Sequence, residues 1–184
     1  VVDVVMGALS RAIPDKMAAA SHGSMNNLAM GAPATEATAA WSYYETIGGG
    51  MGASARYPGL SAIQTHMTNT LNTPIEVMEM NYPLRVTRYA IRKDSGGKGL
   101  HKGGDGIIRE FAFQAETTVT LLTERRRYSP WGLNDGGAAK LGENRLNGQK
   151  IAGKVCFIAQ KGDQLSIHTA GGGGWGAELS DSEI

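Results

Sequence analysis

The segment IIREFAFQAETTVTLLT, residues 107–123, contains the clearest strand signal in the 184-residue chain. In its first half, the side chains of Ile107, Arg109 and Phe111 alternate with those of the residues between them. A period of two is typical of a β-strand, whose successive side chains point to opposite faces. Residues 117–123 repeat this strand-like character after a short polar connection. We therefore expect two strands here that pair as an antiparallel hairpin.

Strand-like patterns continue on both sides of this segment. They cover residues 41–46, 62–68, 84–92, 155–159 and 165–169. The last two flank the turn sequence KGD at residues 161–163, which predicts a second hairpin. The second half of the chain is therefore expected to form mostly antiparallel sheet, and the first half to be mixed.

Two helices are expected in addition to the strands. Residues 1–12 place valine, alanine and leucine at helical spacing, and Pro14 ends that helix. Pro74 opens a short helix over residues 75–80, because proline is tolerated at the first helical position. The predicted fold class is therefore α+β, with a short helical opening followed by a mostly antiparallel β-sheet region.

The length and composition bound the domain organisation and the class of protein. A chain of 184 residues suits one domain, since domains average roughly 150 residues, and we place a sub-boundary near residues 81–93. The formal net charge of +1 argues against a nucleic-acid or membrane partner, which would require a basic excess. No apolar run approaches the roughly 18 residues that span a bilayer, and no signal-peptide pattern is visible. With one cysteine, Cys156, the composition is typical of a reducing, cytoplasmic setting.

Glycine is unusually frequent, with 26 residues that occur in clusters. The sequence GGGMGA at residues 48–53 could cradle a phosphate, although it lacks the lysine of a Walker loop, or it could be a tight turn between two close backbones. The run GGGG at residues 171–174 could approach a partner or substrate closely, or it could be a flexible tail. From these two segments we take four glycines as candidate binding residues: Gly49, Gly50, Gly172 and Gly173.

Two charged groups are further candidates. Glu76 and Glu79 are three residues apart, so they share one face of a helical turn and could hold a substrate amine or act as acid and base. Such carboxylates are more often part of solvated salt bridges. Arg125, Arg126 and Arg127 follow a strand and could bind a carboxylate or phosphate, or form a solvated edge or a subunit contact.

The histidines and the cysteine give no catalytic pattern. None of the four histidines is spaced as a metal ligand relative to another, so no metal site is expected in this chain. Cys156 alternates with Val155 and Phe157 in a predicted strand, and we expect it to be a small packing residue rather than a nucleophile. No residue is therefore assigned a catalytic role.

Six motifs, read in order, are more specific than any one of them. They are SHGSMNN at 21–27, YYETIGGGMGA at 43–53, NTLNTPIEVMEMNYPLRV at 69–86, DSGGKGLHKGGDGIIRE at 94–110, LLTERRRYSPWGL at 121–133 and HTAGGGGWG at 168–176. This succession resembles the C-terminal part of the hydantoinase B/oxoprolinase family. The resemblance covers nearly the whole chain and implies a fragment, or a split subunit, of a larger architecture.

The resemblance implies a function in an ATP-dependent cyclic amidohydrolase that opens hydantoin or 5-oxoproline, as in N-methylhydantoinase. The same motifs are shared with the large subunits of acetone and acetophenone carboxylases, and a non-catalytic assembly segment is a third alternative. The implied partners are the remainder of the hydantoinase B-type polypeptide and a hydantoinase A-type ATPase subunit, in a hetero-oligomer.

The resemblance also implies where the cofactors of such an enzyme lie. ATP and Mg are expected on the A-type subunit, and a divalent metal is expected in the region upstream of this one. We expect no cofactor and no metal in this chain, and no activity of the chain alone. Within it, the three consecutive arginines would stabilise phosphate charge or contact a subunit, and the glycine loops would approach an intermediate or the ATPase subunit.

Overall fold

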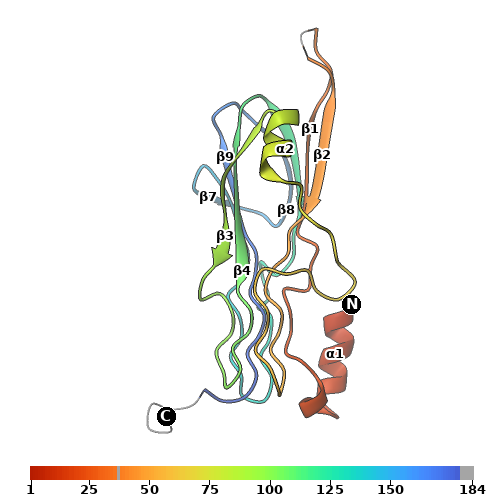
Figure 1. The fold of residues 1–184 in the computed structure, drawn as a ribbon, viewed down its shortest axis with the longest axis vertical. Helices are drawn as coiled ribbons and strands as arrows, with labels where there is room; N and C mark the ends of the chain where they lie inside the picture. The colour runs from red at the N-terminus through yellow and green to blue at the C-terminus, as the bar shows by residue number, and fades with distance from the viewer. Residues whose placement is uncertain (37, 179–184) are drawn as a thin grey trace.

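The computed structural model describes residues 1–36 and 38–178. It is elongated, with two β-sheets packed together in one half and a bundle of extended segments, linked by isolated β-bridges, in the other (Figure 1). Its helices are α1 (Val2–Ser10), the 3-10 helix η1 (Pro14–Lys16) and α2 (Ile75–Asn81). Its strands are β1 (Asn27–Ala32), β2 (Trp41–Thr46), β3 (Leu84–Arg92), β4 (Gly106–Phe113), β5 (Thr117–Leu122), β6 (Glu143–Leu146), β7 (Gln149–Ile151), β8 (Lys154–Ala159) and β9 (Gln164–His168).

The two sheets form a sandwich around one apolar core. One sheet has the strand order β2-β1-β5-β8 and the other the order β3-β4-β9-β6-β7, and every named pair of strands is antiparallel. The inward-facing residues of both sheets meet in this core, for example Leu28, Val119 and Leu121 from one sheet and Phe111 and Leu165 from the other. The predicted α+β class with mostly antiparallel sheet is confirmed.

Both predicted hairpins are wrong, although their four strands are present. The strands β4 and β5 lie in different sheets, and so do β8 and β9. Each short connection therefore carries the chain from one sheet to the other. The physical reason is burial: each strand has one apolar face, and two faces on opposite sheets bury each other across the core. A turn signal between two strands does not distinguish this arrangement from pairing within one sheet.

The local predictions had mixed outcomes. The strand at Leu84–Arg92 is confirmed, and the short helix after Pro74 extends to Asn81. The strand predicted at residues 62–68 is wrong, because only Ile63 forms an isolated bridge, with Gly49, and Ala62 and His66 have positive φ. The backbone turns in this segment, so the alternating residues do not share one face of a strand.

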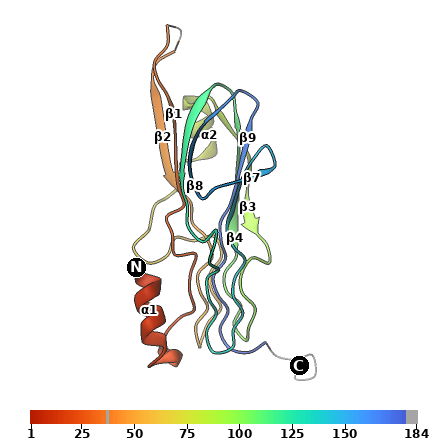
Figure 2. The same ribbon diagram turned by 180° about the vertical axis from the view of Figure 1, so that it is seen from behind.

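The opening helix α1 is shorter than the predicted 1–12 and differs in what it buries. Val4 and Val5 are exposed, with 74% and 53% of their surface accessible, whereas Asp3 and Ser10 are buried. The helix lies beside the bundle of extended segments, as both views show (Figures 1 and 2). A charged residue therefore faces the body of the protein at the start of α1.

We call the half of the molecule that lies outside the two sheets the glycine bundle. Its segments are residues 18–22, 48–53, 58–63, 94–105, 130–140 and 170–176. Neighbouring segments are joined by backbone hydrogen bonds, such as Gly172 N to Gly104 O and Gly97 N to Gly172 O, both 2.9 Å. One segment thus bonds to several neighbours around it, which resembles the packing of polyproline II chains more than a flat sheet.

Glycine is required in the bundle because the backbones approach too closely for a side chain. A Cβ atom on Gly172 would overlap the carbonyl group of Met51, and one on Gly173 would overlap that of Trp131. The run at residues 171–174 is therefore not a flexible tail: it is buried in the centre of the bundle. No helix within the described ranges is long and apolar enough to cross a membrane.

Candidate functional site

A buried carboxylate joins residues that are far apart in the sequence. Asp3 Oδ1 lies 2.8 Å from His66 Nε2, and Asp3 Oδ2 accepts a hydrogen bond of 2.6 Å from Arg125 Nη2. Ser21 Oγ lies 2.8 Å from the same His66 nitrogen, and Thr65 Oγ1 donates to Ser21 Oγ at 3.2 Å. We call Asp3, Ser21, His22, Thr65, His66 and Arg125 the Asp3 cluster.

Local backbone geometry places two members of this cluster. His66 and Arg125 have φ of 59° and 58°, in the left-handed region that non-glycine residues rarely adopt. Such conformations persist only where the surroundings hold them, and they concentrate at functional sites. Here the hydrogen bond of His66 and the ion pair of Arg125 with Asp3 accompany the strained backbone.

The Asp3 cluster is not a Ser-His-Asp triad, despite its composition. In a triad the two imidazole nitrogens have different partners: one forms a hydrogen bond with the serine and the other with the aspartate. In this structure Ser21 Oγ and Asp3 Oδ1 both contact Nε2 of His66. The histidine therefore cannot relay a proton between them, and the arrangement suits orientation and charge balance rather than activation of Ser21.

His22 is the most deeply buried member of the Asp3 cluster. It is fully buried, and its Nδ1 lies 3.4 Å from Gly50 O and 3.5 Å from Thr65 Oγ1. Burial lowers the pKa of His22 to about 4, so it is neutral at physiological pH. Its Nε2 has no hydrogen-bond partner within the described parts of the chain.

Two cavities flank the Asp3 cluster. The larger has a volume of about 640 Å³ and is lined by Asp3 together with residues 123–128 and Lys154. Four cationic side chains and two carboxylates contribute to it, so its lining has a positive excess. The smaller cavity, of about 250 Å³, is lined by Ser21, Thr65 and His66 and by several apolar residues.

The three consecutive arginines line the larger cavity but have different surroundings. Arg125 is paired with Asp3. Arg126 donates to Asn26 Oδ1 and Asn144 Oδ1, each at 2.6 Å, and burial lowers its pKa to about 9. Arg127 is exposed and lies over the ring of Tyr128. Arg127 therefore has the guanidinium group best placed to meet a ligand, whereas Arg126 joins the segments around it.

The other predicted site residues lie elsewhere. Glu76 lines a separate cavity of about 580 Å³, whereas Glu79 accepts a hydrogen bond from the backbone of Val86 at 2.8 Å. The structure does not bring either one to the two cavities beside Asp3.

The candidate binding glycines are in the interior. Gly49, Gly50, Gly172 and Gly173 are all buried in the glycine bundle, and their closest neighbours belong to other segments of this chain. Their predicted role in binding an intermediate or a partner stays a prediction.

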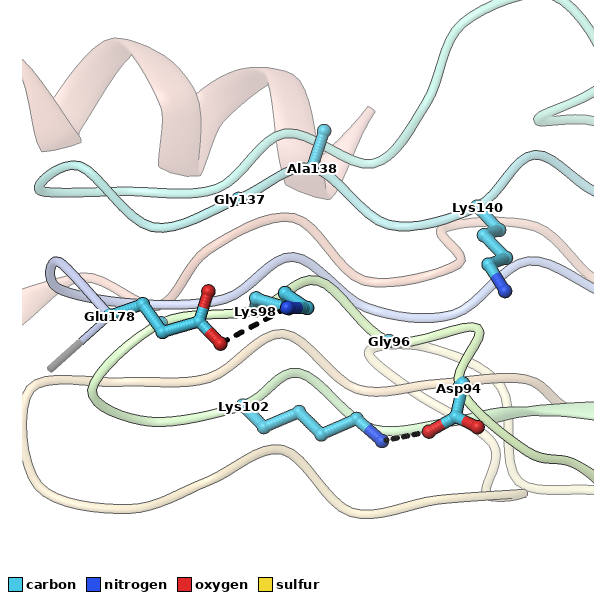
Figure 3. Close-up of a pocket in the computed structure, with 9 residues that line it drawn as sticks. Asp94, Gly96, Lys98, Lys102, Gly137, Ala138, Lys140 and Glu178 are labelled. Atoms are coloured by element: carbon cyan, nitrogen blue, oxygen red, sulfur yellow. Dashed lines mark hydrogen bonds and ion pairs between the residues drawn. The ribbon is translucent and has the colours of Figure 1, made fainter. Parts of the chain in front are cut away.

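A further cavity, of about 540 Å³, opens on the side of the glycine bundle (Figure 3). Lys98 contacts Glu178 at 3.2 Å, and Lys102 lies 3.5 Å from Asp94. Lys140 comes from a different segment of the bundle (Figure 3). The paired carboxylates offset most of the positive charge, so this cavity is a weaker candidate for an anion than the arginine-lined one. Among residues 1–36 and 38–178, no group of three or more metal-binding side chains could hold a metal ion.

Comparison with known proteins identifies the family. The sequence model of the Hydantoinase B/oxoprolinase family matches residues 1–178. The chain belongs to the hydantoinase B/oxoprolinase family. The resemblance predicted from the six ordered motifs is thereby confirmed.

Two relatives illustrate this membership. The chain is 42% identical to "5-oxoprolinase 1" of Arabidopsis thaliana over 184 residues, which cover 97% of this chain and 14% of that protein. It is 31% identical to a protein of Pseudomonas sp. (strain NS671) that is named as the B-type subunit of a D-/L-hydantoinase, covering 97% of this chain and 31% of the relative. The chain thus spans about a seventh to a third of these relatives.

Two solved structures share the fold. The ATP-dependent caprolactamase of Pseudomonas jessenii aligns with a TM-score of 0.70 and 24% identity, over 92% of this chain and 32% of that one. An acetone carboxylase in a nucleotide-free structure aligns with a TM-score of 0.61 and 17% identity, over 91% and 28% of the two chains. At these identities the likeness concerns the fold.

The sequence did not reveal the Asp3 cluster. Its members come from positions 3, 21, 22, 65, 66 and 125, and no local spacing connects them. One signal was available: Asp3 is an acidic residue among valines in a predicted amphipathic helix. In the structure this residue does not cap the helix and is instead the buried partner of a distant cation, Arg125.

Proposed function

We propose that this chain forms part of the B-type component of an ATP-dependent cyclic amidohydrolase, which opens the ring of 5-oxoproline or a hydantoin. The observation that carries the proposal is the 42% identity to a 5-oxoprolinase over nearly the whole chain. The relative named as a B-type hydantoinase subunit supports the same reaction class and a separate partner subunit.

The proposed chemistry explains why a positive cavity is useful. A cyclic amide is a poor electrophile. Transfer of a phosphoryl group from ATP to the amide oxygen makes the amide carbon more electrophilic, so that water can attack it. The carbon–nitrogen bond then breaks to give the free amine and an acyl phosphate, which a second water hydrolyses to the carboxylate and inorganic phosphate. Positively charged groups aimed at the transferred phosphoryl group stabilise the charge that develops there.

In this proposal the arginine-lined cavity beside Asp3 faces the phosphoryl group. Arg127 would contact the anion, because its side chain is exposed and its closest interaction is with the ring of Tyr128. Arg125 would add charge at the rim while remaining oriented by Asp3. ATP and Mg would be held by an A-type ATPase subunit, and a divalent metal by the remainder of the B-type polypeptide.

The proposal is tested with the complete polypeptide that carries this sequence, assembled with its ATPase partner. We expect ATP-dependent release of the ring-opened product from 5-oxoproline or hydantoin, with matching phosphate release. Arg127→Ala should lower turnover by about a hundredfold to a thousandfold, the order found when one group that stabilises transition-state charge is removed. Arg88→Ala, which removes an exposed arginine on β3, is the matched control and should retain turnover.

The same assay separates the alternatives. If ATP consumption required acetone or acetophenone and bicarbonate, and no ring opening occurred, the proposed hydrolase activity would be replaced by a carboxylase activity. The likeness to the acetone carboxylase structure supports only the fold. Turnover by the 184-residue chain alone would contradict the proposal that the chain is one part of a larger enzyme. Unchanged turnover of the Arg127 variant would remove the arginine-lined cavity from the site.

A further inference from the structure

The smaller cavity beside the Asp3 cluster has an apolar wall and a polar end. Its lining comes from α1, from three segments of the glycine bundle and from the loop that carries Thr65 and His66. The apolar lining residues are Met6, Ala18, Ala19, Met51 and Ile63, and the polar ones are Ser21, Gln64, Thr65 and His66. A few convergent polar groups in an otherwise apolar pocket are the usual features of a small-molecule site.

The size of this cavity limits the ligand. Its volume of about 250 Å³ lies just below the range of roughly 300–1,000 Å³ that is typical of pockets for drug-sized molecules. It corresponds to about eight waters at roughly 30 Å³ each. A single small ring with one or two substituents fits this volume.

The polar end offers a nitrogen atom without a hydrogen-bond partner among residues 1–36 and 38–178. His66 is held through Nε2 by Asp3 and Ser21, and the described residues offer no hydrogen bond to its Nδ1. Gln64 also lines this cavity, and its Nε2 contacts the carbonyl of Thr46. An amide N–H in the cavity would supply a donor to Nδ1 of His66.

We propose that this cavity binds the ring of a five-membered cyclic amide, with its methylene groups against Met6, Met51 and Ile63 and its amide group toward His66 and Gln64. The inference rests on the proposed function and adds the place where the ring is held. The Asp3 cluster then forms the wall between this ring pocket and the arginine-lined cavity. One carboxylate, Asp3, orients both His66 on the ring side and Arg125 on the anion side.

The test compares binding and turnover in the assembled enzyme. The ligands are 5-oxoproline and unsubstituted hydantoin, with dissociation constants measured by calorimetry without ATP and KM measured with ATP. Ala18→Leu adds bulk to the ring pocket and leaves every polar group in place. We expect it to weaken binding and raise KM by at least about tenfold, since one methylene in an apolar pocket is worth roughly 10–200-fold.

Two further variants exclude a general structural effect. Ala138→Leu makes the same change at an exposed position on another face of the glycine bundle and should leave both constants unchanged. Met51→Ala enlarges the ring pocket, and we expect it to improve binding of the six-membered lactam 2-piperidone relative to hydantoin. A shift in ring-size preference would not follow from a loss of folding.

The outcomes separate this inference from the proposed function. Ring opening whose KM is the same in wild type and the Ala18 variant would overturn the ring pocket and leave the hydrolase proposal standing. Binding of the cyclic amide that Ala18→Leu weakens, without ATP-dependent ring opening, would support the pocket and overturn the hydrolase. Absence of binding to the wild-type enzyme would overturn the pocket directly.

Discussion

Arg109 on β4 and Glu45 on β2 form an ion pair that joins the two sheets through the core. Arg109 Nε donates to Oε1 and Nη2 to Oε2 of the carboxylate, each at 3.1 Å. The side chains are only 0% and 3% exposed. Tyr43 and Asn72 also donate to Glu45, and the ring of Tyr89 lies 4.4 Å from the guanidinium carbon. The pair therefore fixes how one sheet lies on the other.

Removing one partner of this pair should be more harmful than removing both charges. Arg109→Met leaves the Glu45 carboxylate buried without its cation, and we expect the free energy of unfolding to fall by about 3–5 kcal/mol. The double variant Glu45→Gln/Arg109→Met keeps an amide acceptor for Tyr43 and removes both charges, so it should lose clearly less. Urea denaturation of the three proteins measures this difference. Equal losses in the single and double variants would contradict it.

The glycine bundle should not accept a methyl group at Gly172. Because a Cβ atom there would overlap the backbone of Met51, Gly172→Ala forces two segments apart, and we expect a loss of more than about 3 kcal/mol. Gly148→Ala is the control, since its Cβ would meet nothing within 4 Å. Its positive φ of 79° alone should cost about 1 kcal/mol. Thermal unfolding compares the two, and similar melting temperatures would contradict the close packing.

His22 should make the protein less stable as the pH falls below its ordinary pKa. Burial lowers its pKa from 6.5 to about 4 in the folded state. Between pH 6.5 and about pH 4, His22 is therefore protonated in the unfolded chain and neutral in the folded protein. Above pH 6.5 both states are neutral and no effect is expected. From about pH 7 to about pH 5 this histidine should account for a loss of about 2 kcal/mol.

The variant His22→Gln isolates this effect. It lacks the titrating group, so over the same pH range its stability should fall less steeply than that of wild type, whatever its stability at neutral pH. Some slope remains, because burial also lowers the pKa of His168. Parallel curves for wild type and the His22 variant would show that His22 is not buried in the neutral form.

Cys156 should react readily with thiol reagents in the folded protein. The sequence predicts a packing residue, but the side chain is exposed on the outer face of β8, while Val155 and Phe157 pack against the core. We expect labelling by a maleimide without denaturant at nearly the rate found in denaturant. The reaction is followed by intact mass, with Cys156→Ser as the unlabelled control. Strong protection in the folded state would contradict this placement.

The prediction for Cys156 shows where a sequence pattern stops being informative. Alternation correctly places this residue on the face opposite to Val155 and Phe157. It does not say which of the two faces meets the core, because a small residue such as cysteine is compatible with either. The same limit applies to α1, where helical spacing is correct but the valines are exposed and Asp3 is buried.

The sequence by itself determined several of the local elements and the family. The strand at Leu84–Arg92 and the helix after Pro74 follow from periods and a proline within a few residues, and the six motifs are contiguous. Only the tertiary structure decided that β4 and β5 lie in different sheets, and that Asp3 meets His66 and Arg125. A local sequence pattern indicates which face of a segment is apolar and is expected to be buried. The partner of that face is selected by packing the whole chain, which no single segment specifies.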